Sequence, residues 1–223
     1  MRRRDLLIAG MSLPIAVESQ AAGPAAVLEL FTSQGCSSCP PADAYLGELS
    51  RQPNTIALAW HVDYWNSLGW RDPFASAQST ARQRAYAAQL RDEVYTPALV
   101  VNGAKIVVGS DRSAVTQAIA TTPPPTILPL RRTPAGLESM ASDLPAGASA
   151  LLAFYDAEAA TPVAAGENAG RRLKEYRIVR EAREVPLTGG RIVMPAPPSG
   201  QGAALLIRDA RWRIVAAADS PAA

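Results

Sequence analysis

The sequence predicts an α/β domain with the element order strand, helix, strand, helix, two-stranded hairpin, helix, followed by a small all-β domain. Continuous apolar runs alternate with segments of helical periodicity over residues 25–121. The segment 122–127 holds three consecutive prolines, which favour a stiff, extended linker. Residues 128–220 contain short strand-like runs separated by Gly, Pro and Asp, which predict a β-rich domain of roughly six to eight strands.

The composition is that of a globular protein with a substantial core. Of the 223 residues, 48 % are hydrophobic and 19 % are charged, and the formal net charge at pH 7 is +2. Because charges of both signs are spread along the chain, we expect no nucleic-acid partner and no anionic-membrane surface. Beyond the N-terminal segment, no window has the ~20 consecutive apolar residues that a membrane-spanning helix needs. We therefore expect no membrane span in the mature chain.

Residues 1–22 have the composition of a signal peptide. Three arginines precede a mostly apolar run at 6–17, and small residues follow, with a cleavage site after Ala21. The segment Arg3–Leu7 resembles the twin-arginine export motif, in which two arginines precede a variable residue and two apolar ones. The alternative is a charged N-terminal tail. We expect removal of the segment and a periplasmic or secreted mature protein, in a compartment where disulfides persist.

The α/β domain begins with a buried strand, and a helix and a second strand follow. Ala26–Phe31 is continuously apolar, which is typical of a fully buried strand. Apolar residues within 41–52 recur at helical spacing, and Pro53 ends that helix. The run 55–65 begins as a second apolar strand.

A long helix with a clear start is predicted next, at 71–93. Asp72 is expected to cap this helix, and Pro73 suits its first position, where the missing N–H is not needed. We expect Arg82 and Arg84 to lie on the solvated face of the helix.

Turn and cap residues predict the last elements of the α/β domain, a hairpin and a short helix. Asn102 and Gly103 lie between two apolar runs and predict a hairpin, because both residues tolerate positive φ. Asp111 is then expected to cap a short helix. In the β-rich domain, the segment 171–185 fits a strand or, in part, a helix.

Both cysteines of the chain lie in the turn after the first strand, as Cys36-Ser37-Ser38-Cys39. A Cys-x-x-Cys pair between a strand and a helix places the first sulfur at the helix N-terminus, where the dipole and free N–H groups stabilise a thiolate. The spacing provides a nucleophile, Cys36, and a resolving thiol, Cys39, one turn inside the helix. A structural disulfide or half of a metal site has the same spacing. With two cysteines and one histidine, the chain alone cannot form a Cys₄ or Cys₂His₂ zinc site, and we expect no metal centre.

Longer motifs around the cysteines carry a resemblance to known families. Residues 28–109 resemble the thioredoxin superfamily in element order, in the Cys-x-x-Cys motif and in Thr96-Pro97 before the predicted hairpin. More narrowly, the chain is similar to an exported bacterial family catalogued as domain-of-unknown-function family 1223, through the strings LELFTSQGCSSCPPAD, HVDYWNSLGWRDPF, RQRAYA, YTPALVVNG and GENAGRRL. The resemblance implies a thioredoxin-like fold with an appended β-rich part, and a cis-proline at Pro97 that faces the cysteine pair. It assigns Thr96 and Pro97 to substrate binding. We also expect GENAGRRL to form a loop fixed by Asn168, in a position to contact another part of the chain.

Further candidates flank the cysteine pair. Trp65 is a candidate for the rim of a substrate groove. His61 and Asp63 alternate at the carboxyl end of the second strand, so they share a face and are candidates for an acid or base. Thioredoxin has a buried Asp six residues before its first cysteine, but here Leu30 has that spacing. Glu29 is a third acid or base candidate, although ordinary pleating points it to the opposite face. Each of these residues also fits a packing or capping role.

The sequence favours an exported thiol–disulfide oxidoreductase in which Cys36 and Cys39 act on protein thiols or disulfides, on small thiols, or with a redox partner protein. No cofactor is expected beyond the redox-active disulfide. One alternative is a periplasmic Cu(I) chaperone that uses two thiolates and His61, and another is a non-enzymatic binding module with a structural disulfide. The dipeptide Ser37-Ser38 differs from the Gly-Pro of thioredoxin, so the direction of electron flow stays open.

Overall fold

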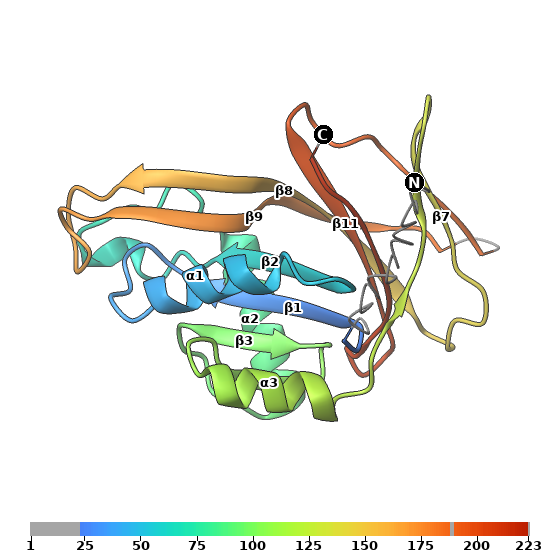
Figure 1. Cartoon of the computed structure of the whole chain (residues 1–223), viewed down its shortest axis with the longest axis horizontal. Coiled ribbons are helices and arrows are strands. Elements are labelled where there is room, and N and C mark those ends of the chain that lie inside the picture. Colours follow the sequence, from blue (N-terminus) through green and yellow to red (C-terminus); the bar gives the residue numbers. More distant parts are fainter. Residues whose placement is uncertain (1–22, 188–189, 223) are drawn as a thin grey trace, which may run out of the picture.

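The computed structural model describes residues 23–187 and 190–222 of the chain. The predicted signal peptide, residues 1–22, lies outside them. Within the described residues, no helix is both long and apolar enough to cross a bilayer. Figure 1 shows helices gathered against one part of a long sheet, while the opposite part of the molecule is built of strands.

A mixed sheet of nine strands runs through the molecule. Its strands are β1 (Ala26–Thr32), β2 (Thr55–His61), β3 (Ala98–Val101), β4 (Lys105–Val108), β5 (Thr126–Ile127), β8 (Ser149–Pro162), β9 (Arg172–Val185), β11 (Gln201–Arg208) and β12 (Ile214–Ser220). They lie in the order β4-β3-β1-β2-β9-β8-β11-β12-β5. Strand β1 is parallel to β2 and antiparallel to β3, and all of its residues are buried. The apolar run that predicted this strand therefore reflects burial on both faces.

Helices cover both faces of the β1–β4 part of the sheet (Figure 1). The helices α1 (Pro40–Leu49) and α3 (Arg112–Thr121) pack on one face, over alternate residues such as Leu28 and Leu30 of β1. The helix α2 (Ala77–Leu90) packs on the other face, over Val27 and Phe31. A short 3₁₀ helix, η1 (Asn66–Leu68), precedes α2. Successive residues of β1 thus point alternately to the α1 face and the α2 face.

The β-rich part continues the same sheet across the predicted linker. The segment 171–185, which fitted a strand or a partial helix, is strand β9, and β9 pairs in parallel with β2. The long antiparallel strands β8 and β9 extend from there to β11 and β12. A separate three-stranded sheet of β6 (Leu130–Thr133), β7 (Gly136–Met140) and β10 (Arg191–Met194) shares a core with them. The predicted boundary at 122–127 therefore separates two sets of elements along the chain, but not two sheets.

The hairpin predicted at Asn102-Gly103 is confirmed, because β3 and β4 pair on either side of it and both residues have positive φ. Asn102 also has a wider role. Its side-chain oxygen accepts a hydrogen bond from the backbone N–H of Val27 at 2.7 Å, and its carbonyl accepts one from Ile214 at 2.9 Å. A Cβ at Gly103 would collide with the carbonyl of Trp212, so only glycine fits where the β-rich part meets this turn.

The two predicted helix caps differ in outcome. Asp111 caps α3 as expected, since its carboxylate accepts a hydrogen bond from the N–H of Ala114 at 3.0 Å. The prediction that Asp72 caps the long helix is wrong: α2 begins at Ala77, and Ser76 is its N-cap. Asp72 is buried instead, because a tertiary partner holds its carboxylate.

Candidate functional site: a buried cysteine pair and its polar surroundings

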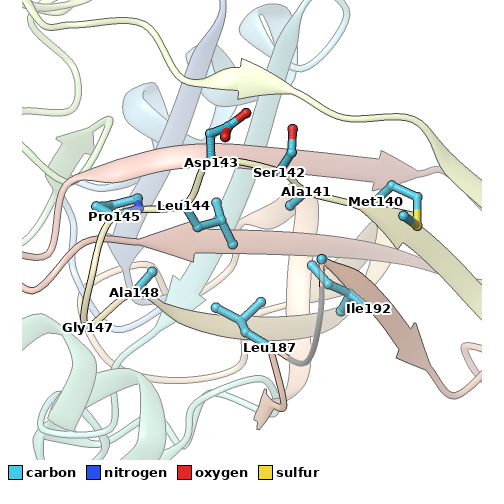
Figure 2. A pocket seen from close by; sticks show the side chains of 11 residues that line it. Met140, Ala141, Ser142, Asp143, Leu144, Pro145, Gly147, Ala148, Leu187 and Ile192 are labelled. Atoms are coloured by element: carbon cyan, nitrogen blue, oxygen red, sulfur yellow. The ribbon is translucent and has the colours of Figure 1, made fainter.

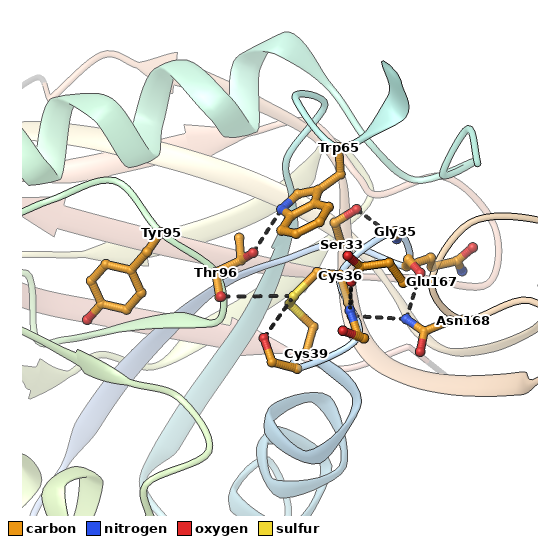
Figure 3. The surroundings of a disulfide bond; sticks show 12 residues. Ser33, Gly35, Cys36, Cys39, Trp65, Tyr95, Thr96, Glu167 and Asn168 are labelled. Carbon is orange, nitrogen blue, oxygen red and sulfur yellow. Dashed lines mark hydrogen bonds between the residues drawn. A yellow bond between two sulfur atoms is a disulfide. The ribbon is translucent and has the colours of Figure 1, made fainter. Parts of the chain in front are cut away.

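Cys36 and Cys39 form a disulfide in the turn between β1 and α1 (Figure 3). Both cysteines are completely buried, with an exposed fraction of 0 %. The sequence placed Cys39 one turn inside the helix, but the structure makes it the N-cap residue, and α1 begins at Pro40. Pro40 and Pro41 explain this start, because proline lacks the N–H that the first helical positions leave unpaired. The same prolines remove two N–H donors that would otherwise stabilise a thiolate.

Thr96 and Trp65 lie beside the disulfide (Figure 3), and Pro97 follows Thr96 in the chain. The Sγ atom of Cys36 is 3.9 Å from the carbonyl oxygen of Thr96 and 3.3 Å from the hydroxyl of Ser38. The Thr96–Pro97 peptide bond is cis. The indole N–H of Trp65 donates to the Thr96 hydroxyl at 2.9 Å. Trp65 also packs on the cysteine loop, since a side chain at Gly35 would meet the Cβ of Trp65 at 3.0 Å.

The loop between β8 and β9 holds the cysteine turn from the other side (Figure 3). The Nδ2 atom of the buried Asn168 donates to the carbonyls of Gln34 and Cys36, both at 2.9 Å. The carboxylate of Glu167 accepts a hydrogen bond from the N–H of Ser37 at 2.9 Å. The sequence indicated a loop fixed by Asn168, but not which segment it contacts. The β-rich part therefore contributes directly to the surroundings of the disulfide.

His61 is the centre of a buried polar cluster on the α1 face. Its Nδ1 atom lies 2.7 Å from the carboxylate of Asp72, and neither side chain is exposed. Burial alone would lower the pKa of His61, but the Asp72 carboxylate raises it to about 9. Burial acts to raise the pKa of Asp72, yet the imidazolium and backbone N–H donors, including that of Gln34, keep it below its usual value. At neutral pH this pair is an imidazolium bound to a carboxylate.

Asp43 and Glu175 complete this cluster, and the sequence interpretation missed both. Asp43 lies on α1 and is close enough to Thr32, His61 and Glu175 for each to affect its pKa. Burial raises the pKa of Asp43 to about 7, and it also raises the pKa of Glu175. Four buried atoms here lack a hydrogen-bond partner among the described residues: Thr32 Oγ1, Asp43 Oδ1, His61 Nε2 and Glu175 Oε1. We call Asp43, His61, Asp72 and Glu175 the α1-face cluster.

The α1-face cluster is tied to the cysteine loop by Gln34. Its side-chain N–H donates to Glu175 at 2.7 Å, and its side-chain oxygen accepts from the indole N–H of Trp70 at 3.0 Å. Its backbone N–H donates to Asp72 at 2.9 Å. Asp43 has a second link, because it lies four residues after Cys39 and so on the same side of the helix, one turn further on. That spacing is the signal that sequence reasoning had available for Asp43.

The other two acid or base candidates lie away from the cysteines. Glu29 points to the α2 face, where Arg82 donates to both of its carboxylate oxygens, at 2.6 and 3.0 Å, and Tyr86 donates a further hydrogen bond. The expectation that Arg82 faces solvent is therefore wrong, because it is buried against a carboxylate that the charge pattern did not reveal. We call Glu29, Arg82 and Tyr86 the α2-face cluster. Asp63 accepts from the Thr80 hydroxyl at 2.6 Å and fastens the loop after β2 to α2.

A cavity of 660 Å³ lies far from this chemistry, in the β-rich part (Figure 2). Met140, Leu144, Leu187 and Ile192 supply apolar walls, and Asp143 is the acidic side chain at its edge. Its lining contains neither cysteine and no member of the α1-face cluster. Across the described residues, no group of three or more His, Cys, Asp or Glu side chains is arranged to hold a metal ion. The copper alternative thus gains no support from the geometry around His61.

These features define a disulfide site of the Cys-x-x-Cys type, built between a strand and a helix and enclosed by Trp65, Thr96 and the β8–β9 loop. A family model described as a protein of unknown function, DUF1223, matches residues 27–207, and the chain belongs to this family. The match confirms the narrower of the two resemblances drawn from the sequence.

Two solved structures are similar to the chain. The crystal structure of protein AGR_C_4864 from Agrobacterium tumefaciens has 27 % sequence identity and a TM-score of 0.77, and the match covers 90 % of this chain and 96 % of that one. HBP35 of Porphyromonas gingivalis has 12 % identity and a TM-score of 0.59, with 91 % and 76 % covered, which is a likeness of fold alone. A comparison with curated proteins finds no match.

Proposed function

We propose that the protein is an exported thiol–disulfide oxidoreductase with a thioredoxin-like fold, whose Cys36–Cys39 pair alternates between disulfide and dithiol. The observation that carries the proposal is the placement of the pair between β1 and α1, with the Thr96 carbonyl beside the sulfur of Cys36. The element order β1-α1-β2-α2-β3-β4-α3, the sheet order β4-β3-β1-β2 and the cis Thr96–Pro97 bond support the thioredoxin-like part of the proposal.

The exchange proceeds in two balanced steps. A substrate thiolate attacks Sγ of Cys36, a mixed disulfide forms, and the Cys36–Cys39 bond breaks as Cys39 leaves as a thiolate. A second substrate thiolate then attacks the substrate sulfur of the mixed disulfide and releases Cys36 as a thiolate. The substrate is oxidised by two electrons to a disulfide, and the cysteine pair is reduced. The reverse sequence reduces a substrate disulfide, and the difference in reduction potential between the partners sets the direction.

Asp43 is the group that exchanges a proton with Cys39 in this proposal. When Cys39 leaves as a thiolate, the protonated Asp43 carboxyl supplies a proton, and in the reverse direction the Asp43 carboxylate accepts it. Burial raises the pKa of Asp43 to about 7, so both forms are populated at neutral pH. Its unpaired Oδ1 and its position one turn after Cys39 support the assignment.

The burial of the pair requires that the site opens before it reacts. Because both cysteines have an exposed fraction of 0 %, a substrate sulfur must first displace a covering group. Trp65 is the group we assign to this cover, held by its hydrogen bond to the Thr96 hydroxyl. In this proposal, movement of Trp65 away from Thr96 and from the cysteine loop uncovers the side of Cys36 that faces Thr96, where an extended substrate backbone binds.

Single cysteine variants test the reaction. We expect Cys36→Ser to abolish disulfide exchange with a dithiol substrate, and Cys39→Ser to accumulate mixed disulfides that mass spectrometry detects. The Cys36→Ser/Cys39→Ser double variant is the control for folding. A reduction potential of about −120 mV would identify an oxidant, and one of about −270 mV would identify a reductant. A wild-type protein that exchanges with no thiol under native conditions contradicts the proposal.

Complete burial also favours a second candidate, in which the disulfide only stiffens the loop that Asn168 and Glu167 hold. This candidate predicts a reduction potential below about −300 mV, as structural disulfides have. Trp65→Ala separates the two. For an oxidoreductase, we expect it to speed reduction by dithiothreitol by about tenfold in the folded protein, since one covering side chain is gone. For a structural disulfide, reduction follows global unfolding, and its rate changes only as far as stability does.

Export is the part of the proposal that rests on residues 1–22. We expect the protein in the periplasmic fraction of cells, without those residues. Replacing Arg3 and Arg4 together by Lys blocks export if the twin-arginine route is used. Retention of the full-length wild-type chain in the cytoplasm contradicts the proposal.

A further inference from the structure

A second cavity, of 270 Å³, lies on the α2 face, between α2 and the strands β8, β9 and β11. The aromatic and charged side chains of its lining are Trp60, Arg82, Arg183, Glu184, Arg208 and Trp212. We call it the Arg–Trp cavity. It shares no lining residue with the cysteine site or the α1-face cluster, so its use is independent of the proposed redox function.

Two indole rings form the apolar walls of the Arg–Trp cavity. Trp60 is 1 % exposed, and Trp212 is partly buried. The guanidinium carbon of Arg82 is 5.0 Å from the ring centre of Trp60 and 5.8 Å from that of Trp212. The guanidinium of Arg208 stacks on Trp212 at 3.8 Å. Two cations therefore lie against the same aromatic wall.

Several N–H donors of this lining are unused. The indole N–H of Trp60 is buried and has no hydrogen-bond partner among the described residues. Arg82 uses Nε and Nη2 on Glu29 and Tyr86, and Arg208 uses Nε on Ser149 and Nη2 on Glu184. Within the described chain, the Nη1 group of each arginine makes no hydrogen bond to a protein atom. A buried donor without a partner costs free energy, so an acceptor in the cavity would stabilise this arrangement.

Each arginine of the lining pairs with a carboxylate, so the free N–H groups, and not a net charge, favour an anionic acceptor. Arg208 pairs with Glu184, a lining residue in an exposed position, and Arg183 lies 3.7 Å from Glu181. Glu29 lies behind Arg82 and neutralises it, but it occupies only two of the guanidinium nitrogens. A carboxylate is a planar acceptor that matches the remaining N–H groups.

We propose that the Arg–Trp cavity binds a small aromatic carboxylate. Its ring packs against Trp60 and Trp212, and its carboxylate accepts hydrogen bonds from the free N–H groups of Arg82, Arg208 and Trp60. The volume of 270 Å³ is just below the range of about 300–1,000 Å³ that holds drug-sized ligands, so one ring with a short acidic side chain is the size that fits.

Calorimetric titration with benzoate, benzamide and acetate tests the three parts of this proposal. Benzoate has the ring and the charge, benzamide has the ring alone, and acetate has the charge alone. We expect saturable binding of benzoate at least about tenfold tighter than that of either other probe. Benzamide lacks the charge-assisted hydrogen bonds and acetate lacks the apolar ring, and each loss costs at least about this factor. Equal binding of benzoate and benzamide, or no saturable binding of benzoate, overturns the proposal.

Variants assign the binding to this cavity. Arg208→Gln and Trp60→Phe each remove one free donor and keep Arg82 paired with Glu29, and we expect each to weaken benzoate binding by about tenfold or more. Arg180→Gln is the matched control, because Arg180 is on the same strand as Arg183 but stacks on Phe74, away from the cavity. Thermal unfolding of each variant without ligand checks its fold. Unchanged benzoate binding by folded Arg208→Gln and Trp60→Phe proteins overturns the assignment.

Discussion

The two faces of the sheet bury carboxylates in opposite ways. On the α2 face, Glu29 receives two hydrogen bonds from Arg82 and one from Tyr86, so its negative charge is fully matched. On the α1 face, Asp43 has an unpaired oxygen and a pKa raised to about 7 by burial. The imidazolium of His61 acts to lower the pKa of Asp43, but Asp72 already binds it.

The difference separates a structural charge from one that can exchange a proton. A carboxylate that accepts two hydrogen bonds from a guanidinium, as Glu29 does from Arg82, serves packing. A carboxyl group that titrates near neutral pH, one turn from a cysteine, can change its protonation while the cysteine changes its redox state. Burial is common to both clusters, so it does not distinguish them. The unpaired atoms and the pKa near 7 distinguish the α1-face cluster, to which we assign the proton exchange.

The largest effect is expected from a substitution in the α2-face cluster. Arg82→Leu leaves Glu29 buried without its cation, and we expect the free energy of unfolding to fall by about 3–5 kcal/mol. Urea unfolding at pH 7 measures it. The Glu29→Gln/Arg82→Leu double variant is the control, because it removes the uncompensated charge as well and should lose clearly less. An equal loss in the single and double variants would show that packing, and not charge, dominates this cluster.

In the α1-face cluster, a substitution of Asp43 should stabilise the protein. The pKa of Asp43 is 3.8 in the unfolded reference and about 7 when folded, so the folded state holds an extra proton between these values and its stability falls as pH rises through this window. Asp43→Asn removes that loss. We expect a gain of about 2 kcal/mol at pH 8, roughly half of what the full shift would give, and a smaller one at pH 5.

Thermal unfolding of the Asp43→Asn protein at both pH values is the measurement. Asp72, Glu175 and His61 face the same site, and His61 stays protonated over this range because its folded pKa is about 9. The stabilising contribution of His61 is complete below pH 6.5 and is lost progressively between pH 6.5 and 9, so the variant is compared with the wild-type protein at the same pH, where both contain His61. The same gain at pH 5 and pH 8 would rule out titration of Asp43 as its source.

Gln34 links the α1-face cluster to the cysteine loop, so a substitution of Gln34 can be compared with one in the α2-face cluster. Gln34→Leu removes the hydrogen bonds of Gln34 to Glu175 and from Trp70, and we expect the disulfide to be reduced by dithiothreitol about fivefold faster, as for one lost net hydrogen bond. Tyr86→Phe removes two hydrogen bonds from the α2-face cluster, one donated to Glu29 and one accepted from Arg82, and should cost about 1–2 kcal/mol of stability without changing that rate. Equal rate changes in the two variants would mean that both clusters act through general stability.

The smallest effect is expected at Glu167, an exposed carboxylate beside the cysteine turn. Glu167→Gln keeps an acceptor for the Ser37 N–H and removes a negative charge that disfavours a thiolate at Cys36. We expect the reduced protein to react about twofold faster with iodoacetamide at pH 7. The gain should shrink in about 0.5 M salt, because exposed charges are screened. A gain that salt leaves unchanged would point to loop opening and not to charge.

Local chemistry made much of the fold predictable, while long-range partners did not show in the sequence. Asn102-Gly103 and Asp111 act through neighbours a few residues away, and their turn and cap formed as expected. Asp72 looked like a helix cap, since Asp-Pro suits one, but His61 offered a buried partner and took it. Arg82 looked solvated because its partner Glu29 lies 53 residues earlier inside an apolar run.

The candidate site likewise contains residues that local motifs predicted and residues that only the structure shows. Cys36, Cys39, Thr96 and Pro97 carry their motif in the chain, and the structure brings them together. Asp43 was overlooked because an acid in the first turn of a helix is ordinary there. The contact of Asn168 with the cysteine turn joins residues more than 130 positions apart, which no local pattern reveals.

The pairing of β2 with β9 has a consequence for attempts to divide the chain. Residues 25–121 expressed alone would leave β2 as an edge strand, with a row of open N–H and C=O groups between apolar side chains. The buried guanidinium of Arg177, which donates to the carbonyl of Ala57 at 2.9 Å, would be missing as well. Such a fragment is a template for strand addition and should associate with itself. The cysteine motif and the strands that follow it thus need each other for solubility before either contributes to chemistry.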